Sequence, residues 1–207
     1  MIGIISYGSG NINAIATIYK KLNIKYEIIS KPEDLDKAER LILPGVGAFD
    51  ATMRQLIDSG FKEKLEELVI IKKRPILGIC VGLQVMGNGS AEGSMNGLGW
   101  IPGRVKRFDI DKINQAPKLP HMGWNTVSDL RKHPLFDRID SDFGFYFVHS
   151  YYFECDYEEN ILSTSEYGGA FCSSIYKNNI FGMQFHPEKS HGNGVQLLKN
   201  FAEFELC

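Results

Sequence analysis

The fold of this chain is decided by one stretch, Arg74–Gln84, which reads RPILGICVGLQ. An apolar run ends at Cys80, with Gly78 and Gly82 on either side of it. This order predicts a buried strand, a sharp turn that carries Cys80, and a short helix, with the glycines relieving crowding at the turn. A thiol at a helix N-terminus would have a lowered pKa and would suit a nucleophile. A free cysteine is as often a small buried core residue, so the stretch alone leaves both interpretations open.

Short apolar segments alternate with amphipathic segments in the first part of the chain. The helical candidate at 11–22 places Ile12, Ile15 and Tyr19 on one face. Alternation of this kind is typical of βαβ units around a buried parallel sheet. We expect strands at 1–6, 25–30, 40–45 and 75–80, and helices at 11–22, 48–58, 61–73 and 81–86.

The pattern changes after about Gly87, where glycine and asparagine become frequent and the later segments gain aromatic residues. These segments predict antiparallel strands joined by turns, followed by a closing helix. We expect the strands at 103–110, 143–153, 160–169, 170–178 and 180–188, and the helix at 192–206. The fold class is therefore α/β: one flavodoxin-like domain over 1–207, with a mostly parallel central sheet, helices on both faces and a smaller antiparallel sheet.

Composition excludes several classes of function. The 207 residues carry a formal net charge of −2, and the only compact basic cluster, Arg104 to Arg107, is too small for a nucleic-acid surface. No apolar run approaches the roughly 20 residues of a membrane span, and no secretory leader precedes the first strand, so we expect a cytoplasmic protein. Four cysteines without paired spacing predict neither a disulfide framework nor a metal site, and we expect no cofactor.

A proton carrier for Cys80 is offered by FHPEKS, which contains His186 and Glu188. If an extended strand continues through Glu188, both side chains point to the same side, roughly 6.5 to 7 Å apart along the chain. The carboxylate could then orient the imidazole. An exposed His-Pro-Glu turn is the alternative, and His133 and His191, in polar loops, are weaker candidates for the base.

Donors for an oxyanion are offered by the glycine-rich PGVG segment at 44–47. Because parallel strands bring their carboxyl ends to one rim, this segment, YGSGN at 7–11 and the Cys80 turn should converge. The amides of Gly47 and Val81 are the candidate pair. A plain Pro-Gly turn is the alternative.

Together, LPGVGAF, GICVGLQ and FHPEKS resemble the motifs of the class I, or triad, glutamine amidotransferases, in the same order and over most of the chain. The resemblance implies the fold of that class. It also implies a glutaminase in which Cys80 attacks the side-chain amide of L-glutamine, His186 carries the proton to the departing ammonia, and Glu188 orients His186.

The resemblance further implies a substrate pocket and a partner. Gln84 would help to hold glutamine, and the backbone would complete the pocket at Gly45, Gly47, Ser150 and Tyr151. The segments YGSGN, GLGWIPGRVKRF, PHMGWN and FYFVHSYYF resemble glutaminase subunits that pass ammonia to a separate cyclase subunit. That cyclase makes imidazole glycerol phosphate and aminoimidazole carboxamide ribotide in histidine biosynthesis.

A heterodimer with the cyclase would place Trp124 and Lys189 at the interface. Core packing of Trp124 and simple solvation of Lys189 are the alternatives. Ser6, Asn13 and Val81 depart from the commonest pattern of the family. Because these departures leave the partner open, three other functions stay in view: a glutaminase for a surface-glycan synthetase, a stand-alone γ-glutamyl hydrolase or peptidase, and a catalytically silent flavodoxin-like module.

Overall fold

The parallel half of the central sheet comes from the first part of the chain, as predicted. The computed structural model describes residues 1–129 and 131–205. Neighbouring strands run in the order β2-β1-β3-β4, all parallel, and the last residue of β3 pairs with Cys80 at the end of β4. The strands are β1 (Ile2–Ile5), β2 (Tyr26–Ile29), β3 (Arg40–Gly45) and β4 (Ile76–Cys80).

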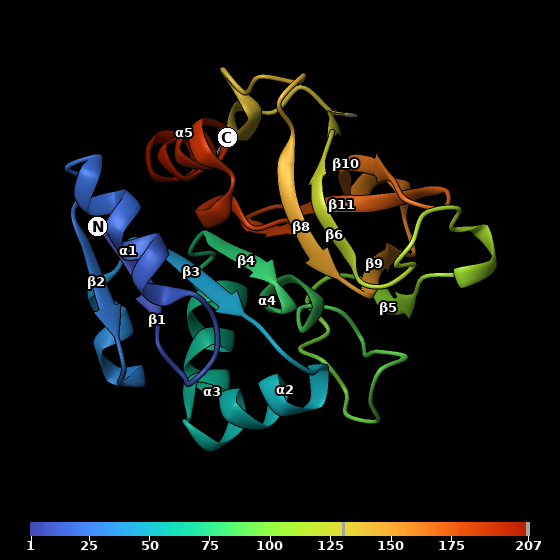
Figure 1. The fold of residues 1–207 in the computed structure, drawn as a ribbon. Coiled ribbons are helices and arrows are strands. Elements are labelled where there is room, and N and C mark those ends of the chain that lie inside the picture. Colours follow the sequence, from blue (N-terminus) through green and yellow to red (C-terminus); the bar gives the residue numbers. More distant parts are fainter. Residues whose placement is uncertain (130, 206–207) are drawn as a thin grey trace.

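Helices cover both faces of this half. One pair, α1 and α5, lies on one face, and a second pair, α2 and α3, lies on the other (Figure 1). Tyr19 of α1 and Phe49 of α2 are completely buried, because each amphipathic helix turns its apolar side to the sheet. The helices are α1 (Ile12–Lys21), α2 (Phe49–Asp58), α3 (Phe61–Leu65) and α5 (His191–Glu203).

Three helices differ from the prediction. The segment expected at 61–73 is α-helical only to Leu65 and continues as a π-helix over Glu66–Ile71. The helix expected after Cys80 is a single turn, α4 (Val81–Gln84). The helix expected at 192–206 begins one residue earlier, at His191, and its last predicted residue lies outside the described residues.

The second half of the sheet is antiparallel except at its junction with the first. The strand β12 pairs in parallel with β4 and antiparallel with β11, so the prediction of a purely antiparallel second half is wrong at this position. All four residues of β12 are buried, which suits a strand between two neighbours inside a covered sheet. The remaining strands are β5 (Gly103–Arg107), β7 (Ser128–Asp129), β9 (Tyr151–Cys155), β10 (Ile161–Glu166), β11 (Ala170–Lys177) and β12 (Ile180–Met183).

A separate two-stranded sheet stands beside the ends of the central strands (Figure 1). It pairs β6 (His121–Asn125), which the sequence pattern did not predict as a strand, with β8 (Phe145–His149). The single strand predicted at 143–153 is therefore two strands, which separate at Ser150 and enter different sheets. This break places Ser150 and Tyr151 at the edge of the candidate site.

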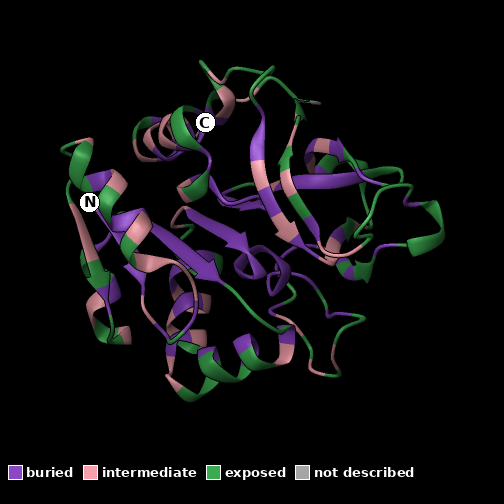
Figure 2. Ribbon diagram, viewed as in Figure 1, coloured by how far each residue is buried: buried purple, intermediate pink, exposed green. Residues whose placement is uncertain are grey.

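The core fills the space between the sheet and its helices. Strands β1, β3 and β4 are buried along their length, whereas the outer sides of the helices are exposed (Figure 2). Short 3-10 turns connect several elements, at Pro32–Lys37, Ile110–Lys112, Pro134–Phe136, Glu158–Asn160 and Pro187–Lys189. Among the described residues, no helix is both long and apolar enough to cross a bilayer.

Candidate active site

Cys80 lies on a strained turn between β4 and α4. Its φ of 55° and ψ of −112° lie in a region that non-glycine residues rarely adopt. The backbone around this turn is closely packed at both flanking glycines. A Cβ atom at Gly82 would approach the carbonyl oxygen of Leu43 to 1.9 Å, and one at Gly78 would approach the carbonyl oxygen of Gly82 to 2.7 Å. The predicted elbow is therefore held by backbone packed against backbone.

His186 and Glu188 meet through a turn, and the predicted extended geometry is wrong. The strand β12 ends at Met183, and Pro187–Lys189 forms a 3-10 turn that folds the carboxylate back onto the ring. Nδ1 of His186 lies 2.8 Å from Oε1 of Glu188, and the side chains are only 2% and 1% exposed. Proline fixes φ near the value that a 3-10 turn requires, which explains why the chain turns here.

The protonation of His186 is set by opposing influences. Burial by itself lowers its pKa, but Cys80 and Glu188 together outweigh burial and raise the pKa to about 10. The ring nitrogen Nε2 is buried without a hydrogen bond of normal geometry among the described residues, although Cys80 is near enough to raise the pKa. The arrangement therefore suits a thiolate beside an imidazolium whose other side is held by a carboxylate.

A cavity of about 370 Å³ opens in front of these groups. Cys80 lines it from the end of β4, and His186 lines it from the turn that follows β12. Ser150 and Tyr151 line it from the break between β8 and β9. Its other lining residues are Val46, Gly47, Val81, Gln84, Glu92, Pro120, Val148, His149 and Lys189. All the predicted substrate-binding residues except Gly45 thus line one cavity. Gly45 lies beneath it, where a Cβ atom would come within 2.4 Å of the Gly82 amide nitrogen.

Gln184 and Glu92 are among the residues at or beside the cavity that the sequence did not indicate. Gln184 is completely buried, and its Nε2 donates to Sγ of Cys80 at 3.8 Å. Nothing in the local pattern singles it out, because it follows directly after the apolar strand β12, between Met183 and Phe185. Glu92 lies in a glycine-rich loop and accepts a hydrogen bond from the amide of Phe49 at 2.9 Å, which holds its carboxylate beside the cavity.

Comparison with known proteins matches residues 4–204 to the family model "Glutamine amidotransferase class-I". The chain belongs to the class I glutamine amidotransferases. It is 46% identical over 202 residues to "Imidazole glycerol phosphate synthase subunit HisH" of Leptospira borgpetersenii, covering 98% of this chain and 99% of that one. It is 47% identical over 203 residues to the protein of the same description from Bdellovibrio bacteriovorus, covering 98% and 100%.

Solved structures share the fold of this amidotransferase. A crystal structure of a glutamine amidotransferase superposes with a TM-score of 0.74 at 18% identity, covering 97% of this chain and 96% of that one. A glutamine amidotransferase from Thermotoga maritima gives a TM-score of 0.61 at 18% identity, covering 90% of this chain and 75% of that one. The predicted fold class is thereby confirmed.

The candidate oxyanion segment of the amidotransferase is tied to the N-terminal glycine loop. Ser9 Oγ accepts from the amide of Val46 and donates to the carbonyl oxygen of the same residue, each at 2.9 Å. The amide of Val46 is therefore engaged, which leaves the amide of Gly47, at the same cavity, as the candidate donor of this segment. Gly47 has a φ of 94°, and a Cβ atom there would meet nothing within 4 Å, so its conformation rather than crowding requires glycine.

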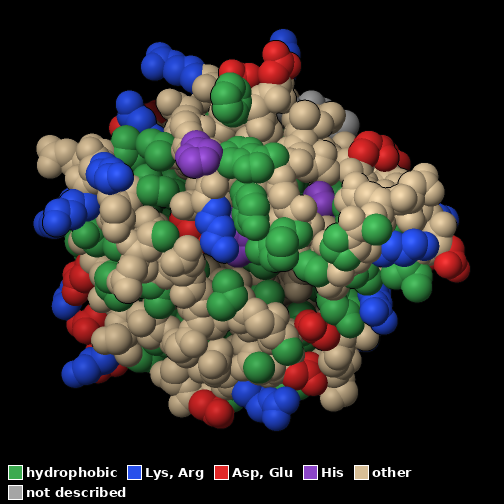
Figure 3. Space-filling view, viewed as in Figure 1, with side chains coloured by type: hydrophobic (Ala, Val, Ile, Leu, Met, Phe, Trp, Pro, Cys, Tyr) green, Lys and Arg blue, Asp and Glu red, His purple; other side chains and the backbone are tan. Residues whose placement is uncertain are grey.

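The two predicted interface residues lie on the outer side of the site. Trp124 of β6 is 45% exposed, so core packing does not account for it, and its ring stacks on His191 at 5.2 Å. Lys189 lies at the cavity, with Nζ 5.6 Å from the centre of the Tyr146 ring. Hydrophobic side chains gather over β6 and β8 on this face, while most charged side chains lie toward its edge (Figure 3).

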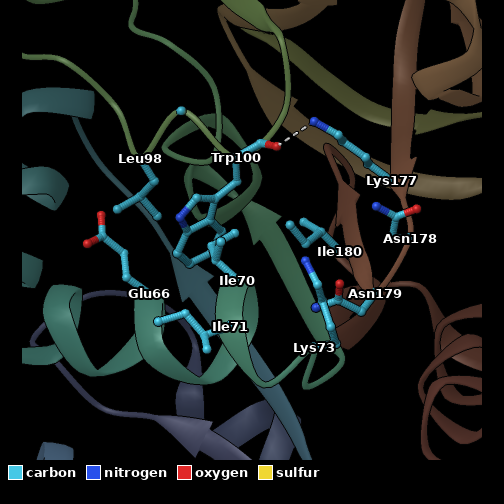
Figure 4. Close-up of a pocket in the computed structure, with 11 residues that line it drawn as sticks. Glu66, Ile70, Ile71, Lys73, Leu98, Trp100, Lys177, Asn178, Asn179 and Ile180 are labelled. Carbon is cyan, nitrogen blue, oxygen red and sulfur yellow. Dashed lines mark hydrogen bonds between the residues drawn. The ribbon is translucent and has the colours of Figure 1, made fainter.

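A larger cavity, of about 550 Å³, lies at the opposite ends of β4 and β12 (Figure 4). Ile70 and Ile71 of the π-helix line it, together with Trp100, and Lys177 donates to the Trp100 carbonyl oxygen at 3.3 Å. The described residues around it include no cysteine or histidine. Cys80 and His186, the predicted nucleophile and base, line the smaller cavity instead. Among the residues that the structure describes, no group of three or more His, Cys, Asp or Glu is placed to hold a metal ion.

Proposed function

We propose that this amidotransferase hydrolyses L-glutamine to glutamate and ammonia through Cys80, His186 and Glu188. One observation carries the proposal: a cysteine on a strained elbow shares a small cavity with a buried histidine whose pKa is raised to about 10 by that cysteine and a carboxylate. Burial lowers this pKa and is outweighed, so the ring keeps a proton to give. A buried structural histidine would lack such a partner pair.

The reaction proceeds in two steps. The Cys80 thiolate attacks the side-chain carbonyl carbon of glutamine, and the C–S bond forms as the carbonyl oxygen becomes an oxyanion. The amides of Val81, at the start of α4, and of Gly47 are the candidate donors to that oxyanion. His186 then gives its proton to the amide nitrogen, the C–N bond breaks, and ammonia leaves a γ-glutamyl thioester. Water attacks the thioester, His186 takes the proton, and glutamate leaves the thiol.

The cavity also suits the amino-acid end of the substrate. Glu92 is the acidic residue among those that line the cavity, and Lys189 is the basic one. The two charges complement the α-ammonium and α-carboxylate groups of glutamine. The side chain of Gln84, with Nε2 engaged, leaves its carbonyl oxygen as an acceptor on the cavity side.

The ammonia is proposed to pass to a cyclase subunit, because the two relatives are named as subunits of imidazole glycerol phosphate synthase. Trp124, Met122 and Phe143 are exposed to 45%, 59% and 70%, and they offer an apolar surface for that subunit. Lys189 joins this surface to the cavity. A heterodimer that makes imidazole glycerol phosphate and aminoimidazole carboxamide ribotide is the proposed assembly.

Glutamate release with and without the cyclase encoded in the same genome tests the proposal. The wild-type chain with cyclase should release glutamate, Cys80→Ser should lose at least 1,000-fold, about the scale of removing a nucleophile, and Cys155→Ser should keep full activity. Persistent release by Cys80→Ser would contradict the proposal. Full activity that never responds to the cyclase, together with cleavage of γ-glutamyl peptides, would favour a stand-alone hydrolase.

A further inference from the structure

Two buried histidines stand beside the cavity and have no part in the proposed reaction. His121 begins β6 and His149 ends β8, and they are 4% and 6% exposed. Nδ1 of His121 lies 3.0 Å from Nε2 of His149. A pair of buried imidazoles needs every ring nitrogen to be satisfied, so its hydrogen bonds can be followed atom by atom.

The hydrogen bonds fix both tautomers. Nδ1 of His149 lies 2.8 Å from the carbonyl oxygen of Tyr151, which can only accept, so this nitrogen carries the proton. Nε2 of neutral His149 is then the acceptor, and Nδ1 of His121 must donate to it. Nε2 of His121 in turn accepts from Nδ2 of Asn125 at 3.2 Å. The Asn125 amide orientation is set independently, since its Oδ1 accepts from the Thr126 amide at 2.9 Å.

The surroundings keep both rings neutral. Burial lowers the pKa of His121 to about 4 and, with smaller contributions from His121 and His186, lowers the pKa of His149 to about 3. Aromatic rings enclose the pair: His121 stacks on Tyr167 at 4.0 Å, and Phe108 lies 5.3 Å from His149. A second proton on either ring would set two N–H groups against each other. The chain of donors and acceptors therefore has one arrangement near neutral pH.

The same network of hydrogen bonds extends from His149 to Cys80. The Tyr151 carbonyl oxygen that accepts from His149 also accepts from Nε2 of Gln84 at 3.2 Å. The same Nε2 donates to Oε1 of Gln184 at 3.0 Å, and Nε2 of Gln184 donates to Sγ of Cys80 at 3.8 Å. Both hydrogens of the Gln84 amide are thus used, so its carbonyl oxygen is the atom left for a ligand.

We propose that His149, held by His121, is a positioning residue of the glutamine site, which fixes the Tyr151 carbonyl and through it the amide orientations of Gln84 and Gln184. This role rests on the proposed glutaminase function and adds to it the group that decides which atom Gln84 offers to the substrate. The residue also closes the bend at Ser150, because its ring bonds the backbone two residues ahead. Substrate recognition therefore depends on a donor, Nδ1 of His149, that is itself bonded to the protein backbone.

A role in packing alone is the competing explanation, and two variants separate it from positioning. His149→Asn keeps an N–H donor near the place of Nδ1 but removes most of the ring. His149→Gln is closer in length and can accept from His121, but it places its amide near Nε2 and loses the donor to Tyr151. If His149 positions the site, affinity for a glutamine analogue should fall in His149→Gln and be retained in His149→Asn. If His149 only packs, His149→Asn, which has the smaller side chain, should be the more damaged variant.

The test uses the full chain with the cyclase present, and it has two readouts. Alkylation of Cys80 is followed with acivicin, an electrophilic analogue of L-glutamine, and with iodoacetamide, which needs no amino-acid pocket. We expect His149→Gln to raise the half-saturating acivicin concentration about fivefold to tenfold, the scale of one hydrogen bond. We expect His149→Asn to stay within about twofold of wild type, and iodoacetamide rates to change little in either.

The second readout is the ¹⁵N spectrum of histidine-labelled wild type at neutral pH, assigned with the two variants. We expect two neutral rings protonated at Nδ1. A His149 ring protonated at Nε2, or a charged ring, would overturn the proposal. So would an acivicin affinity of His149→Asn that is equal to or weaker than that of His149→Gln. If acivicin fails to modify wild-type Cys80 while iodoacetamide succeeds, the glutaminase assignment falls and the proposal falls with it, whatever the spectrum shows. A wrong tautomer with normal acivicin labelling overturns only the positioning role.

Discussion

The two sides of the candidate site are held in place by different forces. On one side, Cys80 sits on an elbow whose backbone contacts leave no room for a Cβ atom at Gly78 or Gly82. On the other side, His186 is held by hydrogen bonds: its amide donates to the Tyr146 carbonyl oxygen at 2.9 Å, and its carbonyl oxygen accepts from Ser190 Oγ at 2.6 Å. Substitution of a glycine that packs against the Cys80 turn should therefore abolish function at once. Removal of single hydrogen bonds around His186 should reduce function by degrees.

The largest effect is expected at the elbow. Gly82→Ala would place a Cβ atom 1.9 Å from the Leu43 carbonyl oxygen, so β3 and α4 would have to separate. We expect a loss of more than about 3 kcal/mol in the free energy of unfolding, comparable to severe overpacking, together with loss of Cys80 labelling. Gly192→Ala, in α5 and open to space, is the matched control and should be neutral or slightly stabilising. A fully active, stable Gly82→Ala would show that the elbow is not sterically fixed.

The next effect is expected at the carboxylate. Glu188→Gln removes the charge that, with Cys80, opposes burial and raises the pKa of His186 to about 10. Turnover should fall roughly 100-fold to 1,000-fold, while Glu159→Gln, on the exposed surface, should be normal. Unchanged turnover in Glu188→Gln would exclude an orienting role.

The pH profile of turnover should follow from the same pair. Because the folded pKa of His186 is raised to about 10 from 6.5, the ring keeps its proton through neutral pH and loses it only near pH 10. Activity that depends on this proton should hold up to about pH 9 and then fall. In Glu188→Gln the descending limb should move to lower pH. If the fall in activity occurred at the same pH in Glu188→Gln as in the wild type, a group other than His186 would be responsible for it.

A smaller, graded effect is expected at Ser190. Its Oγ donates to the His186 carbonyl oxygen and accepts from the Tyr146 amide at 2.9 Å. Ser190→Ala leaves both backbone groups without this partner, which should cost about 1 to 3 kcal/mol in unfolding free energy. Turnover should drop only a few fold, because Glu188 still holds the ring. Ser141→Ala, in an exposed turn, is the control. If Ser190→Ala lost as much stability and Cys80 labelling as Gly82→Ala, the two sides of the site would not differ in the way proposed.

A pH-dependent loss of stability is expected in mild acid. The pKa values of His121 and His149 are lowered to about 4 and about 3 by burial, below the usual 6.5. The unfolded chain therefore binds more protons than the folded chain between those values, and stability present above pH 6.5 is lost as the pH falls toward 4. Denaturant unfolding at stepped pH should show this loss, and His121→Gln should reduce its slope. An identical slope in the variant would place the proton uptake elsewhere.

The sequence predicted the elbow well because its determinants are local. Glycines two residues on either side of Cys80 exclude side chains from one turn, and the apolar run before it can only be buried. The geometry of His186 and Glu188 was mispredicted because Pro187 allows both an extended strand end and a 3-10 turn. Which one forms depends on Ser190 and Tyr146, which contact the turn only in the folded chain.

Gln184 could not have been found from its surroundings. It follows directly after the apolar strand β12. Its partners, Gln84 and Cys80, are about a hundred positions away in the chain. The pairing of β6 with β8 was missed for a similar reason, since HMGWN carries a glycine and no clean alternation, and its partner strand supplies the buried face. Tertiary contacts, rather than propensity, decide both features.

The central claim is that Cys80 is the nucleophile toward glutamine, and mapping the site of acivicin attachment tests it most directly. The full chain, with cyclase present, should carry one adduct on the peptide that contains Cys80, none on those that contain Cys155 or Cys172, and excess L-glutamine should protect it. Glu188→Gln should be modified more slowly at the same residue. An adduct on another cysteine, or none on Cys80 when iodoacetamide can reach it, would contradict the claim.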